Sequence, residues 1–178
     1  MFSIKVSDQL YNHCLNQVNN FNFGARYTAN GNQEQQLTGI IGQSVVMDLF
    51  GLGYVDGGDG FDDGVDIVFE NKKIDVKTMG RTTDVRRSYT NNFLKLQDYF
   101  NPDIYIFCSY NKTKKEVTVC GWIEKEDFTS KRKYFPKGST RYRQDGSSFQ
   151  TFADLYEIDI VDLNDANSIE ELKAQIKG

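Results

Sequence analysis

The chain has 178 residues, of which 39% are hydrophobic and 26% charged, and its formal net charge is −4. This length and composition favour one globular domain over residues 1–178 and exclude a largely disordered chain. The sequence has no apolar run of the roughly 20 residues that a membrane helix needs, and its start lacks a secretory pattern. Three cysteines without a C-x-x-C pair predict a reduced, cytoplasmic protein. With only one histidine, they also argue against a structural zinc site.

Helical patterns dominate the first third of the chain. Residues 7–20 are predicted to form a helix that is capped at its start by Ser7 or Asp8. Residues 33–50 form a second helix, whose apolar positions continue around its circumference, so we expect it to be largely buried. These apolar residues are Leu37, Ile40, Ile41, Val45, Val46, Met47, Leu49 and Phe50. The connectors on both sides are rich in Gly, Asn and Asp and are predicted to be loops.

The rest of the chain alternates between strand patterns and polar segments. Short runs of β-branched and aromatic residues predict five strands, at residues 65–69, 73–79, 103–110, 116–123 and 153–161. Two more helices are predicted, the last with capping-box spacing between Ser168 and Glu171. They are residues 124–131 and 168–177. The other segments are a basic polar stretch at 80–92, a short amphipathic piece at 93–100 and a basic loop at 132–148.

The order of these elements indicates the fold class. Helices come first, strands follow with a few helical insertions, and the sequence contains no internal repeat. Such an order is typical of an α/β or α+β domain, in which helices pack on a mixed β-sheet. We therefore predict an α/β fold with a central mixed sheet flanked by helices.

The stretch GVDIVFENKKIDVKTMG, residues 64–80, has the most distinctive chemical pattern. Side chains of a strand alternate between its faces, so Asp75 and Lys77 share one face while Val76 turns to the other. We expect the apolar face to enter the core and the charged pair to face a cleft or solvent. The predicted hairpin can bring Asp66 close to Asp75, provided that the strand register suits it.

Two converging carboxylates favour a divalent cation, because the cation relieves their repulsion. Mg²⁺ binds one or two carboxylates together with water and phosphate oxygens, and the carbonyl of Val76 is a further oxygen ligand. Lys77 can orient or deprotonate the attacking water, or stabilise negative charge on a phosphate. The pattern therefore indicates phosphodiester hydrolysis with Mg²⁺ or Mn²⁺. Asp-x-Lys also occurs on solvated strand faces without any catalytic role, and this second interpretation stays open.

Asp66, Asp75 and Lys77 resemble the active-site motif of the PD-(D/E)XK nuclease superfamily, as its first acid, second acid and lysine. A valine precedes the first acid, where the motif has proline. The stretches GIIGQSVVMDLF, DVKTMGRTT, GWIEKEDF and ADLYEI extend the resemblance over residues 39–158, to small nucleases of bacteria and their phages. The resemblance implies a restriction-endonuclease-like fold and a metal-dependent deoxyribonuclease. Asp66, Asp75 and the Val76 carbonyl would hold the metal.

The helix at residues 33–50 departs from the superfamily at one position. Nucleases of this type often carry a glutamate there, in a GxxGE pattern, whereas GIIGQ has Gln43. A glutamine can ligate a metal through its amide oxygen or hydrogen-bond a metal-bound water, but it brings no charge. We therefore expect weaker metal binding, with Gln43 as a weak ligand or as a support for the ligands. The alternative is a polar residue on a partly exposed turn.

Basic residues gather in two segments that can contact a nucleic acid. Residues 72–95 carry seven basic and two acidic residues, and residues 131–143 carry six basic residues and no acidic one. Lysine and arginine bind phosphates, and the interleaved Tyr134, Phe135 and Tyr142 can stack on exposed bases. Basic loops are also commonly just solvated, so the assignment depends on the nuclease motif. The residues assigned to DNA are Arg81, Arg86, Arg87, Lys131, Arg132, Lys133, Lys137, Arg141 and Arg143.

Three functions are compatible with this sequence. The first is a metal-dependent DNA nuclease, favoured by the joint presence of Asp66, Asp75 and Lys77. The second is a nucleic-acid-binding module that keeps the nuclease fold with attenuated or lost cutting, and Gln43 favours it. The third is a protein-interaction domain whose charged strand face serves only solubility. Many nucleases of this superfamily pair up to cut both strands, so the resemblance also implies a homodimer.

Overall fold

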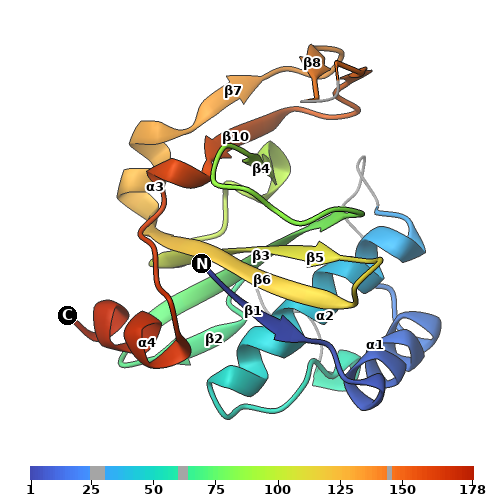
Figure 1. The fold of residues 1–178 in the computed structure, drawn as a ribbon, viewed down its shortest axis with the longest axis vertical. Helices are drawn as coiled ribbons and strands as arrows, with labels where there is room; N and C mark the ends of the chain where they lie inside the picture. Colours follow the sequence, from blue (N-terminus) through green and yellow to red (C-terminus); the bar gives the residue numbers. More distant parts are fainter. Residues whose placement is uncertain (25–30, 60–63, 144–145) are drawn as a thin grey trace.

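The computed structural model of the chain describes residues 1–24, 31–59, 64–143 and 146–178. These residues form a mixed α/β fold (Figure 1). The helices are α1 (Asp8–Asn20), α2 (Gln33–Leu49), α3 (Lys125–Lys131) and α4 (Ile169–Lys177). The strands are β1 (Phe2–Lys5), β2 (Ile67–Phe69), β3 (Lys72–Arg81), β4 (Thr90–Leu94), β5 (Ile104–Asn111), β6 (Glu116–Glu124), β7 (Lys133–Phe135), β8 (Thr140–Tyr142), β9 (Ser148–Gln150) and β10 (Leu155–Asp159).

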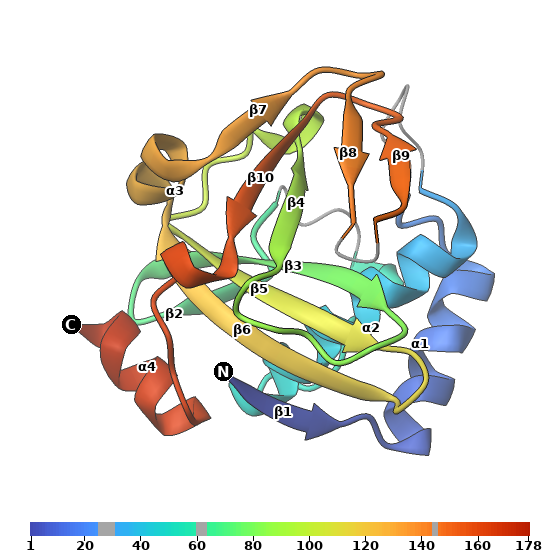
Figure 2. The same cartoon turned by 45° about the horizontal axis from the view of Figure 1, so that its top comes forward.

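Five strands form the central sheet, in the order β1-β6-β5-β3-β2. β2 and β3 form an antiparallel hairpin, β3 and β5 are parallel, and β6 pairs antiparallel with both β5 and β1. The sheet is therefore mixed, as the sequence predicts. A second sheet has the order β4-β10-β7, and the short hairpin β8-β9 stands beside it (Figure 2).

The two faces of the central sheet are covered by different elements. Helices α1, α2 and α4 lie on one face and pack with residues such as Ile74 and Ile106 in the larger core (Figure 1). The β4-β10-β7 sheet and α3 cover the other face, in a second core that includes Phe93, Tyr105 and Phe128 (Figure 2). The central sheet is thus the middle of three layers.

Local sequence explains where the first two helices begin and how closely the second packs. The Ser7 hydroxyl accepts a backbone hydrogen bond at the start of α1, and Asn32 forms a capping box at the start of α2. Gly42 lets α2 approach β3, because a Cβ at this position would lie 1.9 Å from the Oγ1 of Thr78. The predicted bounds of both helices are confirmed to within one residue.

A two-residue turn sets the register of the β2-β3 hairpin. Glu70 and Asn71 both have positive φ, 48° and 63°, which is the conformation of a tight type I′ turn. With this turn Ile67 lies opposite Ile74, and both side chains are buried in the helix-side core. The predicted hairpin is confirmed, although β2 is shorter and β3 longer than the sequence predicts.

The second sheet does not follow from the sequence. β4 lies across the predicted polar stretch and amphipathic piece, followed by a 3₁₀ helix at Lys95–Gln97, and β7, β8 and β9 occupy the predicted basic loop. These strands are short, and β4 and β10 pair over a long separation in the chain, so no local repeat marks them. β1 is also missing from the prediction, whereas β5, β6, β10, α3 and α4 are confirmed.

All three cysteines lie inside the protein. Cys14, Cys108 and Cys120 are buried and free, and they pack as small apolar residues in the two cores. Within the described ranges, no helix combines the length and apolar content that crossing a membrane requires.

Candidate active site

β3 presents its charged residues to the face opposite α2. Ile74 and Val76 enter the helix-side core, so Asp75 and Lys77 point to the other face. The expected cleft or solvent around this pair is wrong, because the β4-β10-β7 sheet covers it. Asp75 is only 2% exposed, and the Nζ of Lys77 lies 5.6 Å from the ring centre of Phe93 on β4. The pair is therefore enclosed between two layers.

Asp66 directly precedes β2 and hydrogen-bonds to β3 on both sides of Asp75. Ile67 is the first paired residue of β2, opposite Ile74 on β3. The backbone N–H of Asp66 donates to the carbonyl of Ile74 at 2.9 Å, and its Oδ2 accepts from the N–H of Val76 at 2.6 Å. These two bonds hold Asp66 beside the backbone of β3 on both sides of Asp75.

The carbonyl of Val76 lies along the same edge of β3. The N–H and C=O of a strand residue point to the same side of the strand. Because the N–H of Val76 meets the Asp66 carboxylate, its carbonyl also points toward the side where β2 begins. The Asp66 carboxylate and this carbonyl therefore lie along one edge of β3, next to Asp75 in the chain.

Lys77 and Asp75 form an ion pair within the enclosed layer. The Lys77 Nζ lies 2.6 Å from the Asp75 carboxylate, and both side chains are largely buried. Removing two charges from water costs free energy that their attraction only partly offsets. Such a pair contributes little net stability compared with apolar groups of the same volume.

The oxygen donors fit a hydrated divalent cation. No group of three or more His, Cys, Asp and Glu side chains within the described residues could hold a metal ion. Two carboxylates and a carbonyl suit Mg²⁺ or Mn²⁺, which keep several water ligands and need few protein oxygens. They do not suit structural zinc, which takes four Cys or His ligands. Asp66, Asp75 and the Val76 carbonyl are the groups that would hold the cation.

Tyr105 on β5 is a candidate site residue that the sequence does not reveal. It is the register partner of Asp75 in the parallel β3-β5 ladder, so the two side chains share a face. Its hydroxyl is buried and has no hydrogen-bond partner among the described residues. Burial raises the pKa of Tyr105 well above its usual range, and the negative charges of Asp75 and Asp98 raise this pKa further. The phenol of Tyr105 therefore stays neutral.

Asn91 on β4 faces the same enclosed layer. Asn91 and Phe93 are both buried and alternate with half-buried neighbours along β4. Both amide atoms of Asn91 lack a hydrogen-bond partner within the part of the chain that is described. A buried polar group without a partner costs about 1–3 kcal/mol. The alternation in TNNFL could have placed Asn91 beside Phe93, whereas Tyr105 depends on the β3-β5 register, which no local pattern shows.

Gln43 lies on α2, beside the point where this helix meets β3. It is half-buried and next to Gly42, which packs against Thr78 on the helix side of the central sheet. Its side chain forms no hydrogen bond with any described residue. A role of Gln43 as a weak ligand or as a support for the ligands stays a prediction.

The three arginines that follow the hairpin differ in exposure. Arg81 is largely buried: its Nη2 donates to the carbonyl of Thr90 at 2.7 Å, and burial lowers its pKa. Arg87 pairs with Asp165. Arg86 is exposed and has no ion pair with a described residue. Arg81 therefore holds the β3-β4 connection, while Arg86 offers its charge to solvent.

Half of the basic residues in the segment 131–143 are ion-paired with neighbouring elements. The pairs are Arg132 with Asp98, Lys133 with Asp159 and Arg141 with Glu157. Lys131, Lys137 and Arg143 are exposed and have no carboxylate partner among the residues that the structure describes. The predicted DNA contacts are thus of two kinds: residues that stabilise the second sheet and residues whose charge is open to solvent.

Comparison with known proteins does not identify this geometry. No protein-family model matches the chain, and no curated protein or solved structure matches it either. The likeness to the PD-(D/E)XK motif therefore rests on Asp66, Asp75 and Lys77 and on the hairpin that carries them.

Proposed function

We propose that the chain is a divalent-metal-dependent nuclease that hydrolyses phosphodiester bonds in DNA. The observation that carries this proposal is that Asp66 hydrogen-bonds to β3 on both sides of Asp75, while Lys77 bonds to Asp75. Two acids for a metal and one cation beside them form a set of groups suited to phosphodiester hydrolysis. A restriction-endonuclease-like arrangement of the mixed α/β fold is part of the same proposal.

Each residue of the hairpin has a distinct role in this proposal. Asp66, Asp75 and the Val76 carbonyl hold Mg²⁺ or Mn²⁺, which when bound lowers the pKa of a coordinated water and offsets phosphate charge. The Lys77 ammonium orients the attacking water or stabilises negative charge on the phosphate. Phe93 and the rest of β4 exclude bulk water from the pair, which strengthens these electrostatic interactions.

A nucleic-acid-binding module without cutting activity is the second candidate. The enclosure of Asp75 and its pairing with Lys77 favour it, because a scissile phosphate has no open route to the carboxylate in this arrangement. The glutamine at position 43 also favours it, since this residue brings no third carboxylate to a metal. This module would bind DNA and leave it intact.

Cleavage of labelled DNA in Mg²⁺ and in Mn²⁺ separates the two candidates. The proteins are the wild type, Asp75→Asn, Lys77→Met and a matched control, Asp84→Asn, whose carboxylate pairs with Lys114 on the exposed surface. We expect cutting by the wild type and the control, and a loss of about 10²-fold or more in the two hairpin variants. DNA that is bound but uncut by the wild type in both metals contradicts the nuclease and supports the binding module.

A further inference from the structure

One surface of the molecule combines unpaired basic residues with an exposed aromatic ring. It lies on the arm, which we define as residues 133–143 and 146–152 and which contains β7, β8 and β9. The arm forms one end of the molecule, at the top of Figure 1 and beside β4 and β10 in Figure 2. Within these ranges it carries four basic residues and no acidic one, in a chain whose formal net charge is −4. Charge alone therefore favours an anionic partner.

Two of the four cations stabilise the arm itself. The Nε of Arg141 donates to Glu157 on β10 at 2.8 Å, and its guanidinium lies 3.8 Å from the ring centre of Phe135. Lys133 pairs with Asp159 on β10 at 2.6 Å. Their charges are balanced by these carboxylates, so both residues hold the arm against the second sheet.

Lys137 and Arg143 are the cations that remain open to a partner. Lys137 lies in the turn between β7 and β8, and Arg143 follows β8 with its guanidinium 4.7 Å from the ring centre of Phe149. Neither has a carboxylate partner in the described part of the chain. Proteins that bind duplex DNA through its phosphates commonly make about 6–10 such contacts. Two cations suit a short stretch of single strand better.

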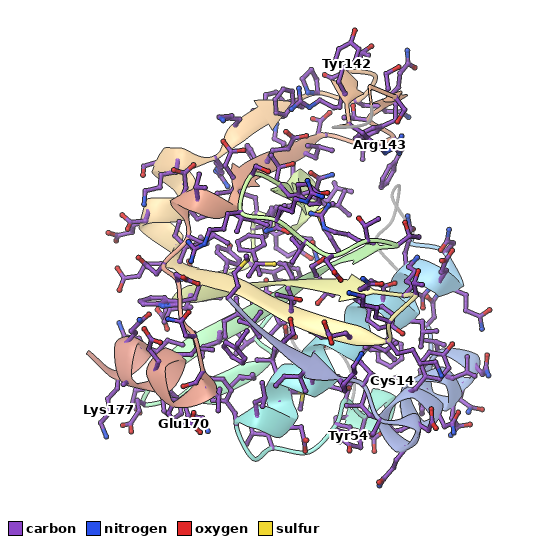
Figure 3. All side chains as sticks on the ribbon, in the orientation of Figure 1. Cys14, Tyr54, Tyr142, Arg143, Glu170 and Lys177 are labelled. Carbon is purple, nitrogen blue, oxygen red and sulfur yellow. The ribbon has the colours of Figure 1, made fainter. Side chains whose placement is uncertain are left out.

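The arm also carries an exposed aromatic ring, that of Tyr142. Its side chain is 74% exposed and contacts no other ring or cation among the described residues. Tyr142 and Thr140 share the outer face of β8, opposite Ser148 and Gln150 of β9. Figure 3 shows Tyr142 projecting from the end of the arm. The outer face is thus one aromatic ring among short, uncharged groups that can donate and accept hydrogen bonds.

We infer that the arm binds single-stranded nucleic acid. Tyr142 stacks on an unpaired base, and Lys137 and Arg143 contact the flanking phosphates. A protein ring stacks on a base whose face is exposed, and the bases inside a duplex already stack on one another. The inference rests on the proposed function in one respect, because it names the kind of substrate that the nuclease receives. Binding at the arm itself needs no metal.

Fluorescence anisotropy in EDTA tests the inference without hydrolysis. The probes are labelled oligo-dT, oligo-rU and a duplex, each about 20 nucleotides long, enough to span the arm. We expect both single strands to bind more tightly than the duplex, and the better of the two distinguishes DNA from RNA. Tyr142→Ala should weaken single-strand binding by about 5- to 150-fold, which is the effect of losing one base–aromatic stack.

Two further variants control for folding and for ring exposure. Tyr142→Trp keeps a stacking ring and should retain binding. Tyr99→Ala removes a ring that is equally exposed, at 73%, but lies outside the arm, and it should leave binding unchanged. A duplex that binds as tightly as the single strands, or a Tyr142→Ala protein that binds like Tyr99→Ala, overturns the inference.

Salt dependence gives an independent readout of the phosphate contacts. Two contacts to a single strand predict a slope of about −1.4 for log Kobs against log salt, whereas contacts from all four arm cations predict about −2.8. The double variant Lys137→Ala, Arg143→Ala should flatten the slope, and Lys133→Ala, which removes a paired charge, should not. If only Lys133→Ala changes the slope, the assignment of the phosphate contacts to Lys137 and Arg143 is contradicted. None of these results depends on cleavage, so the arm and the nuclease proposal fail separately.

Discussion

The two faces of the central sheet differ in whether their buried polar groups have hydrogen-bond partners. On the helix side, Ile41 is fully buried in the core, and the Ser44 hydroxyl accepts from the backbone N–H of Val55 at 3.1 Å. The thiol of Cys14 donates to the same hydroxyl at 3.5 Å. The Oγ1 of Thr78, against α2, is the exception among these residues, since it is buried without a partner. Apolar packing dominates this face.

On the opposite face the core encloses charges and unpartnered polar groups. Asp75 and Lys77 are paired between the layers, while the Tyr105 hydroxyl and the Asn91 amide have no hydrogen-bond partner among the described residues. An apolar filling of the same volume would be more stable. Sequences depart from local consistency mainly at functional sites. The difference between the faces therefore favours the β4-covered layer as the place of function.

Asp75→Ala should give the largest change in stability, because it leaves the buried Lys77 ammonium without its carboxylate. We expect the free energy of unfolding to fall by about 3–5 kcal/mol. The double variant Asp75→Leu, Lys77→Met should recover this loss, since it fills the layer with apolar groups. Urea unfolding followed by circular dichroism measures both. A single variant as stable as the wild type would show that the layer is open to water.

Ile41→Ala makes the matched change on the helix side. Removing this buried side chain should lower the free energy of unfolding by about 3 kcal/mol, through lost burial and a residual cavity. Cleavage by the folded fraction should be unchanged, because Ile41 lies on the other side of the sheet from Asp75. Parallel unfolding and cleavage assays check this. If the fully folded Ile41→Ala protein cleaved DNA more slowly than the wild type, the helix side would also contribute to activity.

Tyr105→Phe separates stability from function on the β4-covered face. Loss of a buried hydroxyl without a partner should leave the free energy of unfolding unchanged or raise it by about 1 kcal/mol. Cleavage should slow by about 10- to 100-fold, as for other residues that support metal ligands. Thermal unfolding and initial cleavage rates test the two parts. A variant that is less stable and fully active would make Tyr105 a structural residue.

The smallest expected effect concerns the cysteines. Their alkylation reports how readily each of the two layers opens. Burial raises the pKa of Cys14 and raises that of Cys120 to about 12. The folded state therefore holds these protons above about pH 8.5, where free thiols ionise, and the associated stability is lost as pH rises toward 12. Alkylation at pH 8 should be slow, with Cys120, beneath the second sheet, reacting before Cys14. Mass spectrometry of the alkylated peptides gives the order, and the reverse order would mark the helix side as the weaker layer.

The sequence predicts local features of this fold better than long-range ones. Alternation in residues 73–79 and a turn at Glu70 and Asn71 suffice for the hairpin, and so for bringing Asp66 to β3 beside Asp75. The cover over Asp75 is different, because β4 pairs with β10, whose residues lie far along the chain. Without that pairing the charged strand face looks solvated. The place of Tyr105 beside Asp75 likewise depends on a parallel register across a long connection.

Calorimetric titration with Mn²⁺ asks whether the carboxylates of Asp66 and Asp75 share one cation. The proteins are the wild type, Asp66→Asn, Asp75→Asn and Lys77→Met. We predict one site in the wild type and its loss in both Asp variants. Binding should be tighter in Lys77→Met, because that variant removes the ammonium that neutralises Asp75. A wild type that binds no Mn²⁺, or binding that survives both Asp substitutions, would contradict a metal site in the β2-β3 hairpin.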